Sequence, residues 1–288
     1  MATVFERLFK LTLAFGASAV GWATLVEPQL LVVRHDEVVL DDWKGAPLRV
    51  AVIADLHVGS PWNGVARVEA LAERVSVEHP DVVVLTGDYA INRIFGGHKV
   101  APSEWAPAIG AIAAPLGVYA VLGNHDWWND EDVYRRALES AGVTMMDNRS
   151  AALRSGDDRI WLVGLGDSWT DHTDVEAAFA GVPRRASTIA FGHEPDIVDV
   201  VGHRADLVLA GHTHGGQVYI PIFSQRLLKL RFRRGRYDVH GVPLYVSSGV
   251  GMSVYPVRFG VPPEVVMLTV RGTEAAAGEH PTLTRGAQ

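Results

Sequence analysis

Aspartate, asparagine and histidine side chains recur in this chain directly after short apolar runs. Such runs are typical of buried strands, whose ends hold side chains more rigidly than free loops do. Carboxylate, amide and imidazole groups are ligands that Mn, Fe, Zn, Ni and Co accept, and the chain has no cysteine. We therefore expect a metal centre at a set of strand ends. The segments concerned are Asp55-Leu56-His57, Gly87-Asp88, Gly123-Asn124-His125-Asp126, Gly192-His193-Glu194 and Gly211-His212-Thr213-His214.

These donors are numerous enough for two ions. Two ions about 3.5–4 Å apart need a bridging carboxylate and further ligands on each. Asp88 is the predicted bridge, because each oxygen of its carboxylate can bind one ion. His125 needs no metal, and its position beside a ligand suits a hydrogen bond to a phosphoryl oxygen and protonation of a leaving alkoxide. The remaining ligands divide into Asp55, His57 and His214 for one ion and Asn124, His193 and His212 for the other.

Glycine stands directly before Asp88, Asn124, His193 and His212. A strand that turns sharply and brings its backbone close to a metal needs a residue without a Cβ atom. Ordinary turns are the alternative, since a single His near a turn is usually structural. Five such segments in one chain favour the metal site.

The apolar runs predict an α/β fold. Strands are expected at 49–54, 81–86 and 118–122, and helices at 65–75, 105–114 and 130–141. A helix between two strands predicts a parallel pair with a right-handed crossover. From residue 143 the elements shorten, which predicts a second, mixed or antiparallel sheet. The strands that suggest it are expected at 143–146, 151–154 and 160–164. Further strands are expected at 187–191, 206–210, 217–220, 243–247 and 265–270, with a short helix at 175–179.

Length and charge limit the classes of function. The chain has 288 residues, enough for one large domain, and we expect a catalytic domain over 29–271 followed by a disordered tail over 272–288. The formal net charge of −7 argues against a nucleic-acid partner. No feature of the sequence indicates a protein partner. The absence of cysteine leaves the cellular compartment open.

The first 28 residues differ from the rest. Residues 8–26 are nearly all apolar or small, apart from Lys10. A membrane anchor, which needs about 20 apolar residues, is the favoured interpretation. A cleaved signal peptide and a helix of the soluble core are the alternatives. Arg7 and Lys10 precede the apolar stretch, so the positive-inside rule favours an exoplasmic catalytic domain, although two charges indicate this only weakly.

Two further segments carry polar or charged side chains that could bind a ligand. The segment 226–236 is rich in arginine and lysine interleaved with leucine and phenylalanine. This pattern is typical of an element that binds a membrane surface or an anionic ligand, and it is also typical of a basic face that contacts only solvent. Asn92, Arg93, His98 and Lys99 lie in the loop after Asp88, where they could contact substrate or only solvent.

Taken together, the five segments resemble the calcineurin-like metallophosphoesterase superfamily over roughly residues 49–271. The resemblance implies a four-layer αββα sandwich of two mixed sheets and the ligand assignment given above. It also implies hydrolysis of a phosphoester by a hydroxide that bridges the metals. The N-terminal apolar segment, Gly87-Asp88-Tyr89, Gly192-His193-Glu194-Pro195-Asp196, the run 211–217 and the run 258–264 are similar to the membrane-associated YkuE/YaeI-type branch.

That branch implies phosphodiesterase activity, and some relatives hydrolyse the pyrophosphate of UDP-2,3-diacylglucosamine. One position departs from the superfamily pattern: many members carry a second Asp three residues after the bridging one, and here that residue is Ile91. The carboxylate that orients His125 must then come from elsewhere. Asp126 is the nearest candidate and is predicted to be catalytic in that sense.

The sequence thus predicts a membrane-associated enzyme with two metal ions that hydrolyses a phosphodiester or pyrophosphate, with a lipid or nucleotide-sugar as one implied substrate. A phosphomonoesterase or phosphoprotein phosphatase with the same core is the alternative within enzymes. A scaffold that keeps the fold without metals is the alternative outside them.

Overall fold

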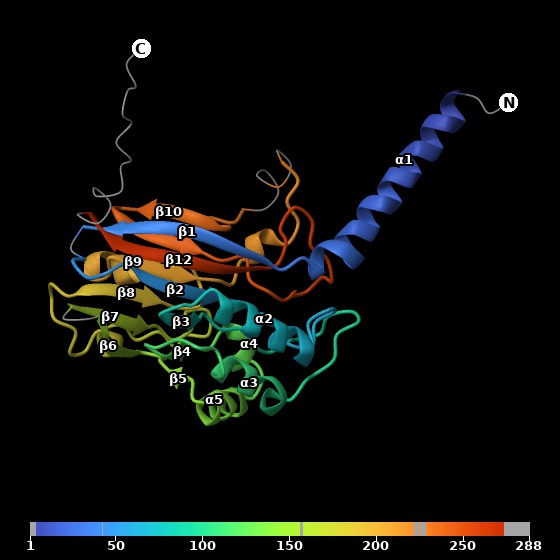
Figure 1. The fold of residues 1–288 in the computed structure, drawn as a ribbon. Coiled ribbons are helices and arrows are strands. Elements are labelled where there is room, and N and C mark those ends of the chain that lie inside the picture. Colours follow the sequence, from blue (N-terminus) through green and yellow to red (C-terminus); the bar gives the residue numbers. More distant parts are fainter. Residues whose placement is uncertain (1–3, 42, 156–157, 222–223, 225–228, 274–288) are drawn as a thin grey trace, which may run out of the picture.

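The computed structural model describes residues 4–41, 43–155, 158–221, 224 and 229–273. They form two six-stranded sheets (Figure 1). The first sheet has the order β1-β12-β2-β3-β4-β5, and its neighbours are parallel except for β12 and β2. Its strands are β1 (Val32–Leu40), β12 (Glu264–Gly272), β2 (Leu48–Ile53), β3 (Val82–Leu85), β4 (Val118–Ala120) and β5 (Thr144–Met145).

The second sheet has the order β10-β11-β9-β8-β7-β6. Its two outer pairs, β10 with β11 and β6 with β7, are antiparallel hairpins, and the inner pairs are parallel. This mixture confirms the predicted mixed sheet. The strands are β6 (Arg149–Ser155), β7 (Asp158–Gly164), β8 (Ser187–Phe191), β9 (Leu207–Ala210), β10 (Gly235–Val239) and β11 (Val242–Val246).

The sheets pack face to face and helices cover their outer faces. Val52 and Val84 of the first sheet and Leu162 and Leu209 of the second are almost fully buried in the core between them. Burying one such side chain stabilises the fold by about 1.5–3 kcal/mol. Helices α2 (Val65–Val77), α3 (Pro102–Gly110) and α5 (Glu131–Ser140) pack on the first sheet. Short helices α6 (Val175–Ala178) and α7 (Ile197–Val201) pack on the second, which confirms the αββα sandwich.

Three sequence expectations were wrong in detail. β5 was expected in the second sheet but pairs with β4, because α5 forms a crossover that returns the chain to the first sheet. Residues 217–220 form only the isolated bridge Val218↔Phe259. β10 was missed because its sequence, GRYDV, is polar; it is an edge strand with alternating exposure.

The N-terminal segment projects from the domain (Figure 1). Helix α1 (Val4–Gly21) buries none of its residues, so it is not a helix of the soluble core. A π-helical turn, Trp22–Val26, and a 3-10 turn, Glu27–Gln29, connect it to β1. Among the described residues, Val4–Gln29 is the one helical segment long and apolar enough to cross a membrane. Of the predicted disordered tail, Gly272 belongs to β12 and residues 274–288 lie outside the described residues.

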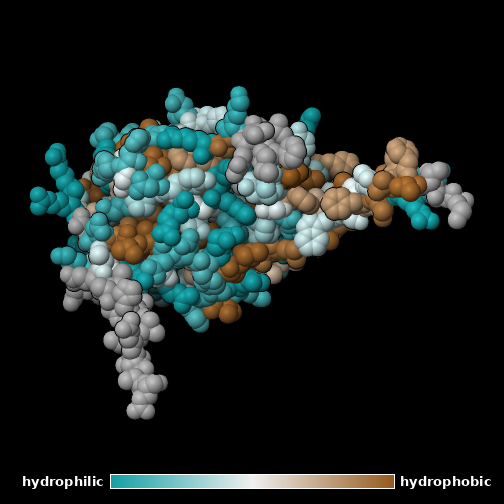
Figure 2. All heavy atoms as spheres, turned by 90° about the horizontal axis from the view of Figure 1, so that it is seen from above, coloured by the Kyte–Doolittle hydropathy of each residue, from teal (hydrophilic) through white to brown (hydrophobic). Residues whose placement is uncertain are grey.

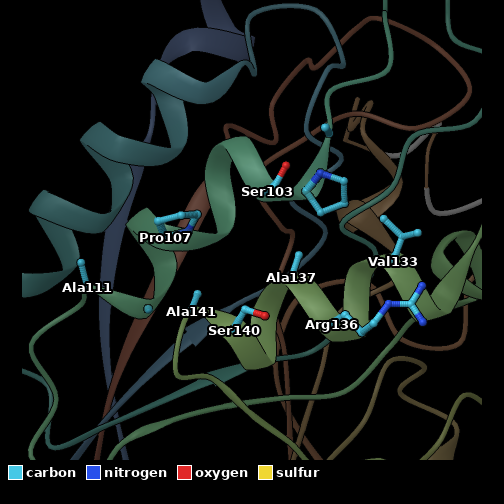
Figure 3. A pocket seen from close by; sticks show the side chains of 11 residues that line it. Ser103, Pro107, Ala111, Val133, Arg136, Ala137, Ser140 and Ala141 are labelled. Atoms are coloured by element: carbon cyan, nitrogen blue, oxygen red, sulfur yellow. The ribbon is translucent and has the colours of Figure 1, made fainter.

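A shallow groove runs between α3 and α5 on the helical layer over the first sheet (Figure 3). It holds about 640 Å³ and is lined mainly by small side chains such as Ser103, Ala111, Ala137 and Ala141. None of the predicted metal ligands lines it.

One buried cation fixes the long loop between β11 and β12. The Arg258 guanidinium is fully buried and donates hydrogen bonds of 2.6–3.2 Å to the carbonyl groups of Ser248, Gly249, Gly251 and Val261. Its backbone N–H donates to the carbonyl of Ala23, 2.9 Å away. Arg258 therefore ties the loop to itself and to the N-terminal segment.

Replacing Arg258 by Met should lower the free energy of unfolding by about 3 kcal/mol or more, because several buried carbonyl groups lose their donor. Chemical denaturation followed by circular dichroism measures this. The matched control is Arg154→Met, an exposed arginine on β6, which should change stability by less than about 0.5 kcal/mol. Equal stability of the two variants would contradict the role given to Arg258.

Candidate metal centre

The candidate site lies at one edge of the sandwich, where strands of both sheets end. Asp55, Asp88 and Asn124 follow β2, β3 and β4 of the first sheet, and His193 and His212 follow β8 and β9 of the second. Because the strands within each group are parallel, their carboxyl ends meet at the same edge. The structure thus brings together segments from five places in the sequence.

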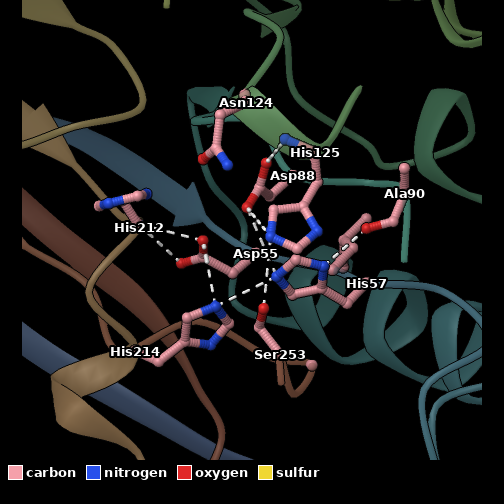
Figure 4. Close-up of polar contacts among 12 residues, drawn as sticks. Asp55, His57, Asp88, Ala90, Asn124, His125, His212, His214 and Ser253 are labelled. Carbon is pink, nitrogen blue, oxygen red and sulfur yellow. Dashed lines mark hydrogen bonds and ion pairs between the residues drawn. The ribbon is translucent and has the colours of Figure 1, made fainter. Parts of the chain in front are cut away.

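One cluster consists of Asp55, His57 and His214 (Figure 4). His214 Nε2 lies 3.7 Å from Asp55 Oδ1 and 3.1 Å from His57 Nε2. All three residues are buried. These are the residues predicted to hold one ion.

A second cluster surrounds the Nε2 atom of His193. Asn124 Oδ1 and His212 Nδ1 each lie 3.0 Å from it. Asp88 stands between the clusters: its Oδ2 atom is 3.2 Å from His193 Nε2 and 3.5 Å from His57 Nε2. This position fits the predicted bridge, and the division of the remaining ligands fits the two clusters.

Hydrogen bonds set the tautomers of two histidines. His57 Nδ1 donates to the Ala90 carbonyl at 2.6 Å, and His193 Nδ1 donates to the Thr86 carbonyl at 2.8 Å. Each ring therefore presents Nε2 to its cluster, and this nitrogen offers a lone pair whenever the ring is neutral. Lone pairs and carboxylate oxygens this close repel one another unless positive charge lies among them. The donor set therefore fits divalent cations.

The ionisation of the site reflects the same need. Burial raises the pKa of Asp55 to about 7 and lowers those of His57 and His212 to about 4. Burial acts in the same direction on His193, but the charge of Asp88 and its hydrogen bond outweigh it and raise the pKa of His193 well above its usual value. The cluster thus attracts positive charge while keeping most of its imidazoles neutral, the form that binds metal.

The backbone at the ligands is strained. Asp55, His57, Asp88, His212 and His214 all have a left-handed φ, between 40° and 68°. Such a conformation costs roughly 1–3 kcal/mol for a residue other than glycine. Strain concentrated on the predicted ligands is typical of a functional site.

Glycine 123 shows why no side chain is tolerated beside the ligands. A Cβ atom there would lie 2.4 Å from Asp88 Oδ1 and 2.8 Å from His193 Nδ1. Both distances are shorter than any real contact. Its role is close approach, because its φ of −107° is open to any residue.

Comparison with known proteins agrees with this geometry. The profile of the family described as calcineurin-like phosphoesterase matches residues 48–216, which carry every predicted ligand. The chain belongs to this family. It is a metallophosphoesterase, a hydrolase, and the family depends on two metal ions.

Relatives and a solved structure extend the comparison. The uncharacterized metallophosphoesterase YkuE of Bacillus subtilis is 26% identical over 88% of this chain and 90% of its own. The phosphodiesterase YaeI of Escherichia coli is 26% identical over 86% of this chain and 88% of its own. The NAD nucleotidase of Haemophilus influenzae shares the fold with a TM-score of 0.50 at 15% identity, covering 73% of this chain and 46% of that one.

Within this phosphoesterase site, Asp126 differs from its prediction. Its carboxylate accepts hydrogen bonds of 2.8–2.9 Å from four backbone N–H groups, those of Asp88, Tyr89, Ala90 and Gly123. Three of these bonds hold the loop that carries Asp88, the fourth binds Gly123 directly before Asn124, and none involves the His125 ring. The prediction that Asp126 orients His125 was therefore wrong, because the short helix α4 (Asn124–Trp127) turns the two side chains to different neighbours.

The His125 ring lies at the edge of the clusters. Its Nε2 atom is 4.0 Å from Asp88 Oδ2 and 3.3 Å from Ser253 Oγ, while Nδ1 has no hydrogen-bond partner. Ile91, where the resemblance leads one to expect an Asp, is buried and apolar. The Ser253 hydroxyl is the group within hydrogen-bond distance of this ring, and no pattern in the sequence pointed to it.

A pocket of about 380 Å³ opens over the clusters. The exposed tryptophans Trp128 and Trp169 stand at its walls, with ring centroids 5.2 Å from His125 and 4.7 Å from His212. Glu194 accepts hydrogen bonds from Ser168 and from the Trp169 N–H, so it fixes the loop that carries Trp169. Sequence reasoning missed both tryptophans, although Trp128 follows the Asn124 segment by one turn of helix.

The predicted basic segment has a different environment from the one expected. Arg231 pairs with Asp196 and Asp199, and Arg236 pairs with Asp36. Arg233 donates to the Gly215 carbonyl and lies 4.2 Å from the Tyr219 ring centre. These arginines are mostly paired within the protein, an arrangement that matches neither the membrane-surface element nor the solvated basic face. Residues 226–228 of the segment lie outside the described residues.

Replacing Asp126 by Asn should destabilise the Asp88 loop, because an amide NH₂ would face two backbone N–H groups. We expect a loss of about 2–3 kcal/mol in unfolding free energy and a lower metal content. Denaturation and elemental analysis measure the two effects. Asp130→Asn, an exposed acid whose side chain makes no cap hydrogen bond, is the control. If Asp126→Asn kept full stability and metal and lost only turnover, a direct catalytic role would be restored.

Proposed function

We propose that this protein is a phosphodiesterase that uses two metal ions, held to a membrane by α1. The observation that carries the proposal is the pair of buried clusters on either side of Asp88. Asp55, His57 and His214 would hold one ion, while the side chains of Asn124, His193 and His212 would hold the other. Mn, Fe, Zn, Ni and Co all suit these donors.

When bound, such ions would lower the pKa of a coordinated water toward neutrality and would polarise a phosphoryl oxygen. The remaining work falls to residues of the chain. The His125 ring, at the rim of the clusters, donates to a phosphoryl oxygen and protonates the leaving alkoxide. The Ser253 hydroxyl, 3.3 Å from Nε2, holds the ring in place before substrate arrives.

The pocket favours a diester over a monoester. Among the described residues that line it, none is lysine or arginine. A phosphomonoester carries about one more negative charge than a diester near neutral pH and has only one organic group. The walls, formed by Trp128, Trp169, Leu230, Val254 and Tyr255, offer apolar surface for organic groups on both sides of the phosphorus. The similarity to a protein named as a phosphodiesterase points the same way.

The exposed apolar helix supports membrane attachment. Val4–Gln29 has the length and composition of a span, and its first part, α1, buries none of its residues on the domain. The positions of Arg7 and Lys10 would place the catalytic domain on the exoplasmic side. A lipid or nucleotide-sugar diester or pyrophosphate is the substrate class that we propose for an enzyme held at that surface.

Diester preference can be tested with two chromogenic substrates. With Mn, Zn or Mg supplied, bis-p-nitrophenyl phosphate should have a kcat/KM about tenfold or more above that of p-nitrophenyl phosphate, because the apolar walls contact its second ring. Asp88→Ala should turn over neither substrate and should bind less metal. A preference for the monoester would favour the phosphomonoesterase alternative. Full metal content in Asp88→Ala would contradict the assignment of Asp88 as the bridging ligand.

The role of His125 can be separated from metal binding. His125→Ala should keep its metal and lose about 10²–10⁴-fold in kcat for an alkyl diester. The loss should be much smaller for bis-p-nitrophenyl phosphate, whose leaving group needs no proton. An equal loss on both substrates would argue against proton donation, and a loss of metal would make His125 a ligand.

A further inference from the structure

Large apolar side chains are exposed around the foot of α1. Trp22 and Trp62 are 46% and 48% exposed, Val254 and Tyr255 are 64% and 67% exposed, and Phe95 is 88% exposed. We call these five residues the collar. They come from four separate parts of the chain, so their nearness is a property of the fold. Figure 2 shows hydrophobic surface continuing from the projecting helix onto the body at its foot.

Contacts with backbone groups hold the segments of the collar near one another. Trp62 Nε1 donates to the Thr24 carbonyl at 2.8 Å, which places that indole against the turn that ends α1. The Phe95 loop lies beside the segment that carries Trp62, because a Cβ atom on Gly96 would be 3.5 Å from the Pro61 side chain. The loop that carries Val254 and Tyr255 reaches the helix through the bond from Arg258 N–H to Ala23.

The foot of α1 is held firmly to the domain. Glu27 is only 4% exposed, and its carboxylate accepts from Trp22 Nε1 at 2.7 Å and from the Val261 N–H at 2.6 Å. Together with the Arg258 bond, these contacts fix the direction in which the helix leaves the domain. The domain is therefore joined to its anchor at a set angle and does not hang from a loose linker.

The collar adjoins the active site. Val254 and Tyr255 line the pocket over the metal clusters, and the residue before them, Ser253, contacts His125. Consecutive residues are about 3.8 Å apart in Cα position. Ser253, the residue that contacts His125, is thus only one or two residues along the chain from the exposed collar.

We propose that the collar rests in the surface of the lipid bilayer and holds the mouth of the active-site pocket against the membrane. The occupant is a bilayer because the one candidate membrane span of the described residues leaves from the collar itself. Tryptophan and tyrosine are also the side chains that settle at the boundary between headgroups and acyl chains. This rests on the proposed attachment through α1 and replaces the basic segment as the docking surface.

The complete chain can be tested because it has no cysteine, so single cysteines report single positions. Nitroxide labels would be placed at Phe95→Cys and Val254→Cys in the collar and at Leu13→Cys within α1. Val77→Cys and Val200→Cys, which are 73% and 57% exposed on α2 and α7, are the matched controls. The protein is reconstituted in vesicles of phosphatidylcholine and phosphatidylglycerol. Power saturation then compares access of oxygen and of a water-soluble nickel complex to each label.

The expected result is that Leu13 and both collar labels favour oxygen by severalfold over the two controls. Collar labels as open to nickel as Val77, with Leu13 in lipid, overturn the proposal while leaving the anchor intact. Collar labels closed to both reagents mean that protein covers the collar, which also overturns it. If Leu13 itself is open to nickel, the anchor fails and the collar with it.

Turnover of soluble bis-p-nitrophenyl phosphate by Phe95→Cys, which should match the unsubstituted chain, is measured in parallel. If neither protein hydrolyses this substrate, the proposed phosphodiesterase activity is contradicted and the proposal about the collar is not.

Discussion

Buried acceptor groups that repel one another are the constraint on which the rest of this structure depends. Carboxylate oxygens of Asp55 and Asp88 face imidazole nitrogens, and at His57 and His193 the Nδ1 proton is donated to a backbone carbonyl. The chain holds them together by other bonds. Four N–H groups meet the Asp126 carboxylate, and the Asp88 and Asp55 carboxylates accept from the N–H groups of His125 and His212. A surrounding backbone network thus offsets the strain and repulsion at the candidate ligands, and bound cations would reduce the repulsion.

The sequence was informative wherever a short pattern determines the structure. Apolar runs of β-branched residues located β2, β3, β8 and β9, because fully buried strands show little else. The candidate ligands could be named because their types are specific and strand ends place them at one edge. Their approach to one another agrees with the family resemblance.

The rest depended on contacts that no local pattern encodes. The sequence around Asp126 is compatible with a hydrogen bond either to the His125 ring or to backbone N–H groups. The helical turn of α4 determines which of the two forms. The sequence around Arg231 and Arg236 predicts an exposed basic surface. The acidic partners of these two residues could not be seen in that local pattern, because they lie more than thirty residues away in the sequence. Trp169 lies in a loop without any motif, so its place beside His212 follows from the bonds that Glu194 makes.

The contribution of both sheets to one centre has a consequence for the interior. Asn124 belongs to the first sheet and His193 to the second, yet their side chains must stay about one hydrogen bond apart. Their separation is set by how the two sheets pack, and stacked sheets lie roughly 10 Å apart according to the side chains between them. The volumes of Val84 or Leu209 therefore influence how well the two halves of the centre match. In this fold the affinity for metal is partly a property of the hydrophobic core. Substitutions of side chains deep in that core would therefore change the metal concentration that the enzyme needs for activity.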